Sequence, residues 1–196
     1  TALVARTHNV PAQVTTLGKR FATWAEELIF AIKHLQELQR RLPLRGIKGA
    51  VGTSQDAIDL LGSSQSGIDQ EITKALGFET LAISPSQIYP RSIDFEVLAT
   101  LVQLSAAASN MATNVRLMSG YGLVSEGFNS DQVGSSAMPH KVNARLSERL
   151  NGLAVVLRGY ALMISEISGN QWNEGDVSCS VVRRVALPDS FYAIDA

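Results

Sequence analysis

The chain has 196 residues, of which 45% are apolar, so one domain with a sizeable hydrophobic core is expected. Its 17 Lys and Arg residues nearly balance 18 Asp and Glu residues, and the net charge of -1 excludes a generally basic nucleic-acid-binding protein. The single cysteine, Cys179, excludes an internal disulfide framework and a multi-cysteine metal site, and it favours a reducing compartment.

No apolar run approaches the roughly 20 residues that a membrane-spanning helix needs, and no signal peptide is visible. We therefore expect a soluble, cytoplasmic protein that binds neither membranes nor nucleic acids. The chain starts at Thr1 without Met and stops at Ala196 inside an apparently helical run. We expect residues 1–196 to be the central helical-bundle domain of a longer polypeptide.

The first long helix is predicted at about 12–42. Its apolar residues recur every three or four positions and define one face, and Pro43 ends it. The segment 45–53 contains three glycines within seven residues, which predicts a loop with close backbone approach. Two short helices follow, at about 54–61 and 66–76, each with a glycine directly after it in a C-cap position.

Two more long helices and a final helix are predicted after these. The first starts near Arg91 and runs to about Ser119, and the small residues in its middle predict close packing at the centre of a bundle. The second covers about 143–168, and the last helix begins near Ser180. No segment alternates with period two for long enough to predict a sheet. The predicted fold class is all-α, a long-helix bundle whose apolar faces exceed what one chain covers, so we expect copies to associate.

The connection at 127–143 is longer than most loops between helices, which indicates a functional or a disordered segment. Five polar residues lie within nine positions of it: Ser135, Ser136, His140, Lys141 and Asn143. The loop ends at a helix start, whose N–H groups and partial positive charge favour an anion. This set suits proton abstraction beside a carboxylate, with lysine stabilising the developing negative charge. A solvated linker with ordinary capping by Asn143 fits the same spacing.

The run Gly134-Ser-Ser-Ala-Met-Pro-His-Lys-Val-Asn143, followed by Glu148, resembles the signature loop of the fumarase/aspartase superfamily. Within that superfamily the chain is most similar to the adenylosuccinate lyases. Arg6-Thr-His8 resembles the segment with their general acid, and Ser86-Gln87 resembles a substrate-binding pair. The stretch 172–190 resembles the one that holds the nucleotide phosphate. The resemblance covers essentially the whole chain.

The resemblance implies a base-catalysed elimination of fumarate from adenylosuccinate and from the succinylated aminoimidazole carboxamide ribotide, without a metal or organic cofactor. It implies two catalytic groups, the base Ser135 and the proton donor His8, whose residue type titrates near neutrality. It also implies a set of substrate-binding residues: Thr7, Gln87, Ser136, Met138, Lys141, Asn143, Ser180 and Arg184. Lys141 and Asn143 would hold the succinyl carboxylates, and Ser180 with Arg184 the phosphate. The implied partner state is a homotetramer with active sites shared between subunits.

One departure concerns the stretch Trp172-Asn-Glu-Gly175-Asp, where the family commonly has arginine in place of Gly175. That part of the site must be built differently, and Arg183 is a candidate to compensate. Two alternatives to the nucleotide substrate stay open. One is a sister enzyme, either argininosuccinate lyase or carboxymuconate cycloisomerase, and the other is a catalytically silent structural oligomer. The histidine in its Arg-Thr-His context favours the nucleotide substrate over the sister enzymes. The joint presence of Ser135, Lys141 and Asn143 argues against a silent protein.

Overall fold

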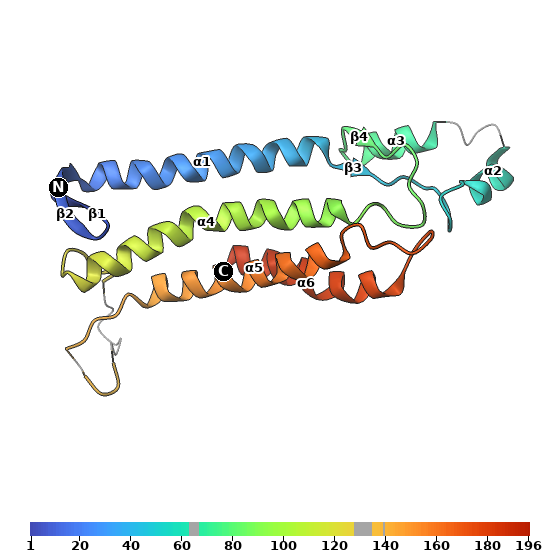
Figure 1. The fold of residues 1–196 in the computed structure, drawn as a ribbon. Helices are drawn as coiled ribbons and strands as arrows, with labels where there is room; N and C mark the ends of the chain where they lie inside the picture. Colours follow the sequence, from blue (N-terminus) through green and yellow to red (C-terminus); the bar gives the residue numbers. More distant parts are fainter. Residues whose placement is uncertain (63–66, 128–134, 139) are drawn as a thin grey trace. The chain divides into compact units, whose positions relative to one another are not determined.

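The computed structural model describes residues 1–62, 67–127, 135–138 and 140–196 (Figure 1). Its elements in chain order are β1 (Ala2–Thr7), β2 (Val10–Thr16), α1 (Leu17–Arg41), β3 (Pro43–Leu44), α2 (Gln55–Leu61), α3 (Ile68–Ala75), β4 (Thr80–Leu81), α4 (Ser92–Gly120), α5 (Arg145–Ile167) and α6 (Val177–Asp195). The predicted all-α class is confirmed, since helices make up most of the described chain. The predicted boundaries of α2, α3, α4 and α5 agree with the structure to within about two residues.

The chain divides into two compact units, which are described separately. Unit 1 comprises residues 1–32 and 103–156, and unit 2 comprises residues 33–102 and 157–196. Unit 1 therefore contains the strands β1 and β2 and the loop before α5. Unit 2 contains the small elements from β3 to β4 and the whole of α6.

The start of the first helix was predicted wrongly, and so was the absence of paired strands. Residues 10–16 form β2, which pairs antiparallel with β1, and α1 begins only at Leu17. The β-branched residues of this segment favour an extended backbone. His8 and Asn9 form the turn, with φ of 51° and 64°, as two-residue hairpins require. The hairpin is largely exposed, so it lacks the alternation of apolar and polar residues that marks a half-buried strand.

In unit 1, α4 is linked to both α1 and α5 by side-chain hydrogen bonds. The Asn110 amide donates to Glu27 of α1 at 3.0 Å, and Asn151 of α5 donates to the Ser109 carbonyl at 2.9 Å. Ala107 and Ala112 of α4 are almost completely buried. Their small side chains permit the close helix packing that the sequence predicted for the middle of α4.

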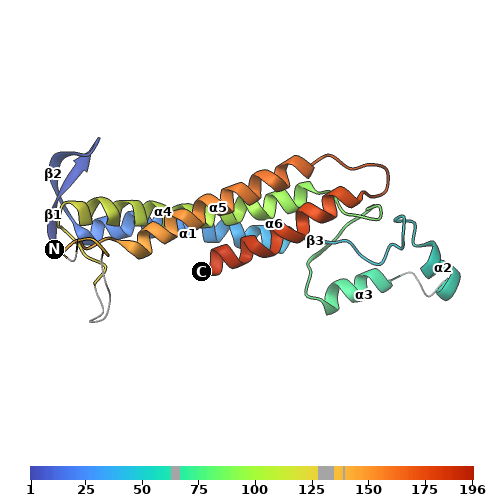
Figure 2. The same ribbon diagram turned by 90° about the horizontal axis from the view of Figure 1, so that it is seen from below.

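Unit 2 has its core where the first turns of α4 meet the end of α5 and the first half of α6 (Figure 2). The buried residues of this core are Leu98, Ile164, Ile167, Cys179 and Ala186. The predicted packing role of Cys179 is thus supported by its burial. Helix α6 begins at Val177, earlier than predicted, because the Asp176 side chain accepts a hydrogen bond from the Ser178 amide and caps the helix.

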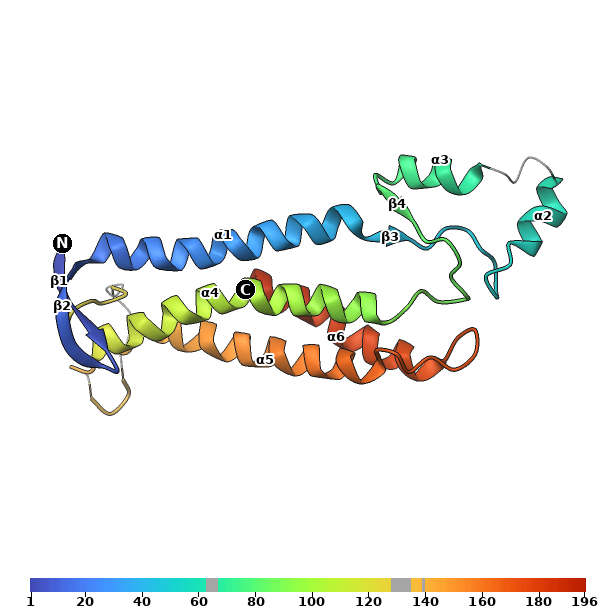
Figure 3. The same cartoon turned by 45° about the horizontal axis from the view of Figure 1, so that its top comes forward.

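The segment from α1 to α4 carries the glycine loop that the sequence predicted. Figure 3 shows its path from β3 through α2 and α3 to β4, which pairs parallel with β3. Gly46, Gly49 and Gly52 all have positive φ. A Cβ on Gly52 would lie 2.8 Å from the Ser86 Cα and would overlap the Pro85 carbonyl oxygen. The predicted close approach is therefore between this loop and residues 85–86.

By length and composition alone, α5 could cross a bilayer, since its most apolar 18 residues have a mean hydropathy of 1.3. The sequence analysis did not anticipate this. Core helices of proteins outside membranes meet the same criterion. Ile164 and Ile167 of α5 lie in the core of unit 2, so packing against α6 accounts for part of the apolar character.

Candidate active site

The predicted proton donor lies at the tip of the β1–β2 hairpin in unit 1. His8 and Thr7 are both exposed there. The neighbouring Arg6 donates to the Asn9 carbonyl at 3.0 Å and so closes the turn that carries His8. The Arg6 guanidinium also stacks 4.0 Å from the ring centre of Tyr121, directly after α4. Arg6 therefore fixes the hairpin tip to the end of α4.

The predicted base lies in the loop before α5, of which residues 135–138 and 140–144 are described, whereas Gly134 and Pro139 of the signature run lie outside the described residues. Ser135 is half-buried, and its hydroxyl oxygen accepts a hydrogen bond from the Met138 amide at 3.2 Å. The Lys141 amide in turn donates to the Met138 carbonyl at 2.9 Å. A hydrogen bond donated to a serine oxygen favours its deprotonated form, which a base requires.

Lys141 and Asn143 border a pocket of about 560 Å³ within unit 1. The charged groups on its wall come from three places: Arg116 on α4, Lys141 on the loop and Glu148 on α5. Arg116 donates to the Asn151 side chain at 3.0 Å. Two cations and an asparagine amide in the lining suit a carboxylate ligand, and Glu148 adds one negative charge to the same lining. Ser136 and Met138 are exposed on the same loop.

The predicted anion site at the start of α5 requires a correction. The Glu126 carboxylate accepts from the amides of Leu146 and Ser147 at 3.0 and 2.9 Å, and from the Ser147 hydroxyl at 2.6 Å. Burial works against the charge of Glu126, but these hydrogen bonds outweigh it and lower its pKa. Two of the amides that were expected to attract substrate are thus occupied by Glu126. The sequence around the start of α5 gives no sign of this cap, because Glu126 lies at the other end of the loop that precedes α5.

In unit 2, the predicted substrate-binding residue Gln87 is exposed at the end of a well-fixed segment. The Ser86 hydroxyl donates to the Glu174 carbonyl at 2.9 Å and accepts from the Gln171 amide at 2.8 Å. On the other side, the Arg45 guanidinium donates two hydrogen bonds to the Ser86 carbonyl, at 2.8 and 3.2 Å. Arg45 was not predicted from the sequence, because its partner lies 41 residues away along the chain.

The two predicted phosphate-binding residues lie on α6. Ser180 is half-buried and Arg184 is exposed. Their spacing of four residues puts both on one face of the helix. Within the described residues, the Arg184 guanidinium makes neither a hydrogen bond nor an ion pair, so it is available to a ligand.

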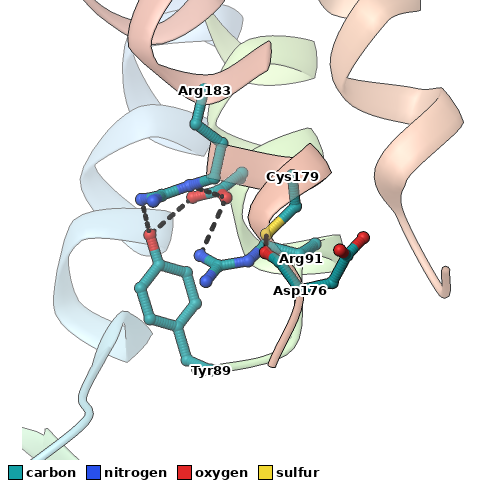
Figure 4. Close-up of polar contacts among 6 residues, drawn as sticks. Tyr89, Arg91, Asp176, Cys179 and Arg183 are labelled. Atoms are coloured by element: carbon teal, nitrogen blue, oxygen red, sulfur yellow. Dashed lines mark hydrogen bonds and ion pairs between the residues drawn. The ribbon is translucent and has the colours of Figure 1, made fainter. Parts of the chain in front are cut away.

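Arg183, the candidate to compensate for the arginine missing at Gly175, is engaged in a partly buried network (Figure 4). Its Nε donates to Asp94 at 2.6 Å, and Asp94 also accepts from the Tyr89 hydroxyl at 2.7 Å. Arg91 makes an ion pair with the same carboxylate at 3.4 Å. Desolvation disfavours the charged guanidinium, but Asp94 and Tyr89 outweigh it and raise the pKa of Arg183. Burial and the neighbouring Asp94 raise the pKa of Tyr89. The network ties the start of α4 to α6.

The predicted site residues divide between the two units of the chain. Unit 1 holds the hairpin residues Thr7 and His8 and the loop residues Ser135, Ser136, Met138, Lys141 and Asn143. Unit 2 holds Gln87, Ser180 and Arg184. Unit 1 thus contains the residues that were assigned to proton transfer and to the succinyl carboxylates, and unit 2 contains the two that were assigned to the phosphate together with the substrate-binding Gln87.

A family model described as "Lyase" matches residues 1–159, and the chain belongs to this lyase family. Curated relatives extend the similarity over nearly the whole chain. The adenylosuccinate lyase of Schistosoma mansoni is 38% identical over 197 residues, which cover 98% of this chain and 41% of that protein. The adenylosuccinate lyase of Saccharomyces cerevisiae is 36% identical over 192 residues, covering 96% of this chain and 40% of that protein.

Solved structures confirm the predicted fold. The 3-carboxy-cis,cis-muconate lactonizing enzyme from Pseudomonas putida matches with a TM-score of 0.82 and 26% identity, over 98% of this chain and 42% of that one. A fumarate lyase from Mesorhizobium matches with a TM-score of 0.76 at 20% identity, over 98% and 41%. The predicted resemblance to the adenylosuccinate lyases is confirmed. The chain spans about two fifths of the length of the relatives that it matches.

Proposed function

We propose that the whole protein containing this chain eliminates fumarate from adenylosuccinate, giving AMP, and from the succinylated aminoimidazole carboxamide ribotide. The observation that carries this proposal is the loop at residues 135–143. There the Ser135 oxygen accepts a hydrogen bond from a backbone amide. Lys141 and Asn143 line a pocket that Arg116 also lines. The similarity to adenylosuccinate lyases along nearly the whole chain supports the choice of substrate.

In the proposed reaction, the Ser135 oxygen removes a proton from the carbon β to the leaving nitrogen. The electron pair of that C–H bond forms the double bond of fumarate. The C–N bond breaks, its electrons pass to the purine nitrogen, and His8 protonates that nitrogen. Lys141 and Asn143 hold the succinyl carboxylates and stabilise the carbanion in its aci-carboxylate form.

The nucleotide end of the substrate would be held by residues of α6. Arg184 offers a free guanidinium fork to a phosphate, and Ser180 offers a hydroxyl on the same helix face. Gln87 would add an amide contact from the segment that Ser86 and Arg45 fix. Thr7, Ser136 and Met138 would complete the contacts to the succinyl group.

We also propose that copies associate as a cytoplasmic homotetramer with shared active sites. Several long apolar side chains on the helices are exposed in the single chain: Phe30, Val155, Leu162 and Val181. Exposed apolar residues on helices of this length are typical of surfaces that a second helix covers.

A second candidate substrate is a carboxymuconate, which the similarity to the muconate lactonizing enzyme favours. A substrate panel separates the two. The whole purified protein is given adenylosuccinate, argininosuccinate and 3-carboxy-cis,cis-muconate at equal concentrations, and product formation is followed for each. We expect fumarate and AMP from adenylosuccinate at a kcat/KM at least about a hundredfold above the others, as a site that binds the phosphate requires. Preference for either other substrate would refute the nucleotide assignment.

A further inference from the structure

Gly175, in the turn before α6, is in contact with the side chain of Gln87. A Cβ built on Gly175 has its three closest neighbours in Gln87: it would overlap the amide oxygen and would lie 3.3 Å from Cδ and 3.5 Å from Cβ. Gly175 is not among the glycines with positive φ. Backbone strain from a positive φ is therefore no obstacle to a side chain at this position, and the atoms in its way belong to Gln87.

The two backbone segments that carry Gly175 and Gln87 are held together by the Ser86 hydroxyl. It donates to the Glu174 carbonyl at 2.9 Å and accepts from Gln171 at 2.8 Å. The Gly175 amide closes the turn on the Trp172 carbonyl at 3.2 Å. Separating the two segments to admit a side chain at position 175 would cost the two hydrogen bonds of the Ser86 hydroxyl.

The segment that carries Gln87 is also blocked on the side away from Gly175. The Arg45 guanidinium holds the Ser86 carbonyl, and Gly52 lies against the backbone of residues 85–86 at a separation that leaves no room for a Cβ. Of the groups involved, the exposed Gln87 side chain is the one that moves at least cost, by rotation about its own bonds.

We propose that Gly175 is a positioning residue for substrate binding. Its bare backbone lets the Gln87 amide lie against the turn that leads into α6, the helix that carries Ser180 and Arg184. A side chain at position 175 turns this amide away from the nucleotide. The inference rests on the proposed function and explains what occupies the place of the arginine that the sequence led us to expect.

The test is a double-mutant cycle in the whole protein, using Gly175→Ala, Gln87→Ala and the double variant. Gly175→Ala should raise KM for adenylosuccinate roughly threefold to tenfold, the scale of one lost neutral hydrogen bond, and leave kcat within about twofold. Added to Gln87→Ala, it should have no further effect. Gly159→Ala is the control, because a Cβ at this α5 position meets nothing within 4 Å. Additive effects in the double variant, an unchanged KM, or a fall in kcat alone would overturn the proposal.

A crystal structure of the Gly175→Ala protein tests the packing without reference to turnover. The proposal requires the Gln87 amide to have rotated away while Ser86 keeps its bond to Glu174. An unmoved amide beside a shifted turn would refute it. If the wild-type protein releases no fumarate but the amide has moved, the proposed function fails and the packing of Gly175 against Gln87 stands.

Discussion

Arg45 offers a demanding test of how the substrate-binding segment is held, because every hydrogen bond that its side chain makes within the described residues goes to a main-chain carbonyl. Its Nε and Nη2 donate to the Ser86 carbonyl, a further bond from Nη2 reaches Gly49 at 2.9 Å, and Nη1 reaches Gly46 at 3.2 Å. The three carbonyls belong to two separate loops. A planar guanidinium can reach all of them from one position, whereas the three N–H donors of a lysine ammonium all radiate from one nitrogen and cannot span the same carbonyls.

The expected loss of unfolding free energy in Arg45 variants follows from the number of carbonyls that lose their hydrogen-bond donor. A hydrogen bond from a charged donor contributes about 1.5–3 kcal/mol, and water replaces part of this at a half-buried site. We expect Arg45→Lys, which keeps one of the three carbonyls satisfied, to lose roughly 1–2 kcal/mol of unfolding free energy. Arg45→Ala should lose roughly 2–4 kcal/mol by the same reasoning. Both should raise KM for adenylosuccinate, because Gln87 follows Ser86 directly.

Urea unfolding at fixed protein concentration measures the loss, since assembly makes apparent stability depend on concentration. Arg158→Lys is the matched control. Arg158 is exposed on α5 and its side chain bonds to no other described residue, so its replacement should change stability by less than about 0.5 kcal/mol. If Arg45→Lys were as stable as the control and had a wild-type KM, the assigned role of the guanidinium would be wrong.

Three further outcomes are expected. Glu126→Gln should cost about 1 kcal/mol of unfolding free energy at neutral pH, measured in urea, because the α5 amides lose a charged cap. Gly52→Ala should cost roughly 2–4 kcal/mol in the same assay, since φ is +85° and the new Cβ would meet the backbone of Ser86. Arg184→Ala should weaken AMP binding in calorimetry by about tenfold or more and fumarate binding by less than about twofold, as expected for a phosphate contact.

Each of these has a result that contradicts it. The pKa of Glu126 is lowered in the folded chain, so its stabilisation is present above the ordinary value of 4.5 and is lost as the pH falls below it. The wild type and Glu126→Gln should therefore converge in stability at acid pH, and a constant difference would exclude the cap. A Gly52→Ala protein of normal stability would mean that the loop yields easily. Equal losses for AMP and fumarate would remove Arg184 from the phosphate site.

The long helices could be predicted because their apolar periodicity is local information. The hairpin could not: β2 is exposed on both faces, so Val10 and Val14 show no contrast between a buried and a solvated side. The helix start at Leu17 was obscured for the same reason. The cap of α6 by Asp176 is local, but the analysis placed the helix start at Ser180 and overlooked it.

The candidate site also has a part that could be predicted from the sequence and a part that could not. The signature loop and the Arg-Thr-His segment could be read directly, because each is a contiguous run of unusual composition. The groups that support them could not be predicted, since their partners are distant in sequence: Arg45 and Ser86 are 41 positions apart, and Arg183 and Asp94 are 89 apart. The contacts of Glu126 could not be predicted for the same reason, because its partners are amides of α5, on the other side of the loop. Spacing within the chain carries no signal for such contacts.

The central claim is that Ser135 is the base of a fumarate-releasing site. Its most direct test is fumarate release from adenylosuccinate by the whole protein, compared with its Ser135→Ala and Ser136→Ala variants. We predict that Ser135→Ala loses at least about a thousandfold in kcat with the helical content and assembly unchanged. Ser136→Ala should keep measurable turnover with a raised KM. Near-wild-type turnover in Ser135→Ala would contradict the account, because no other residue is assigned to remove the proton.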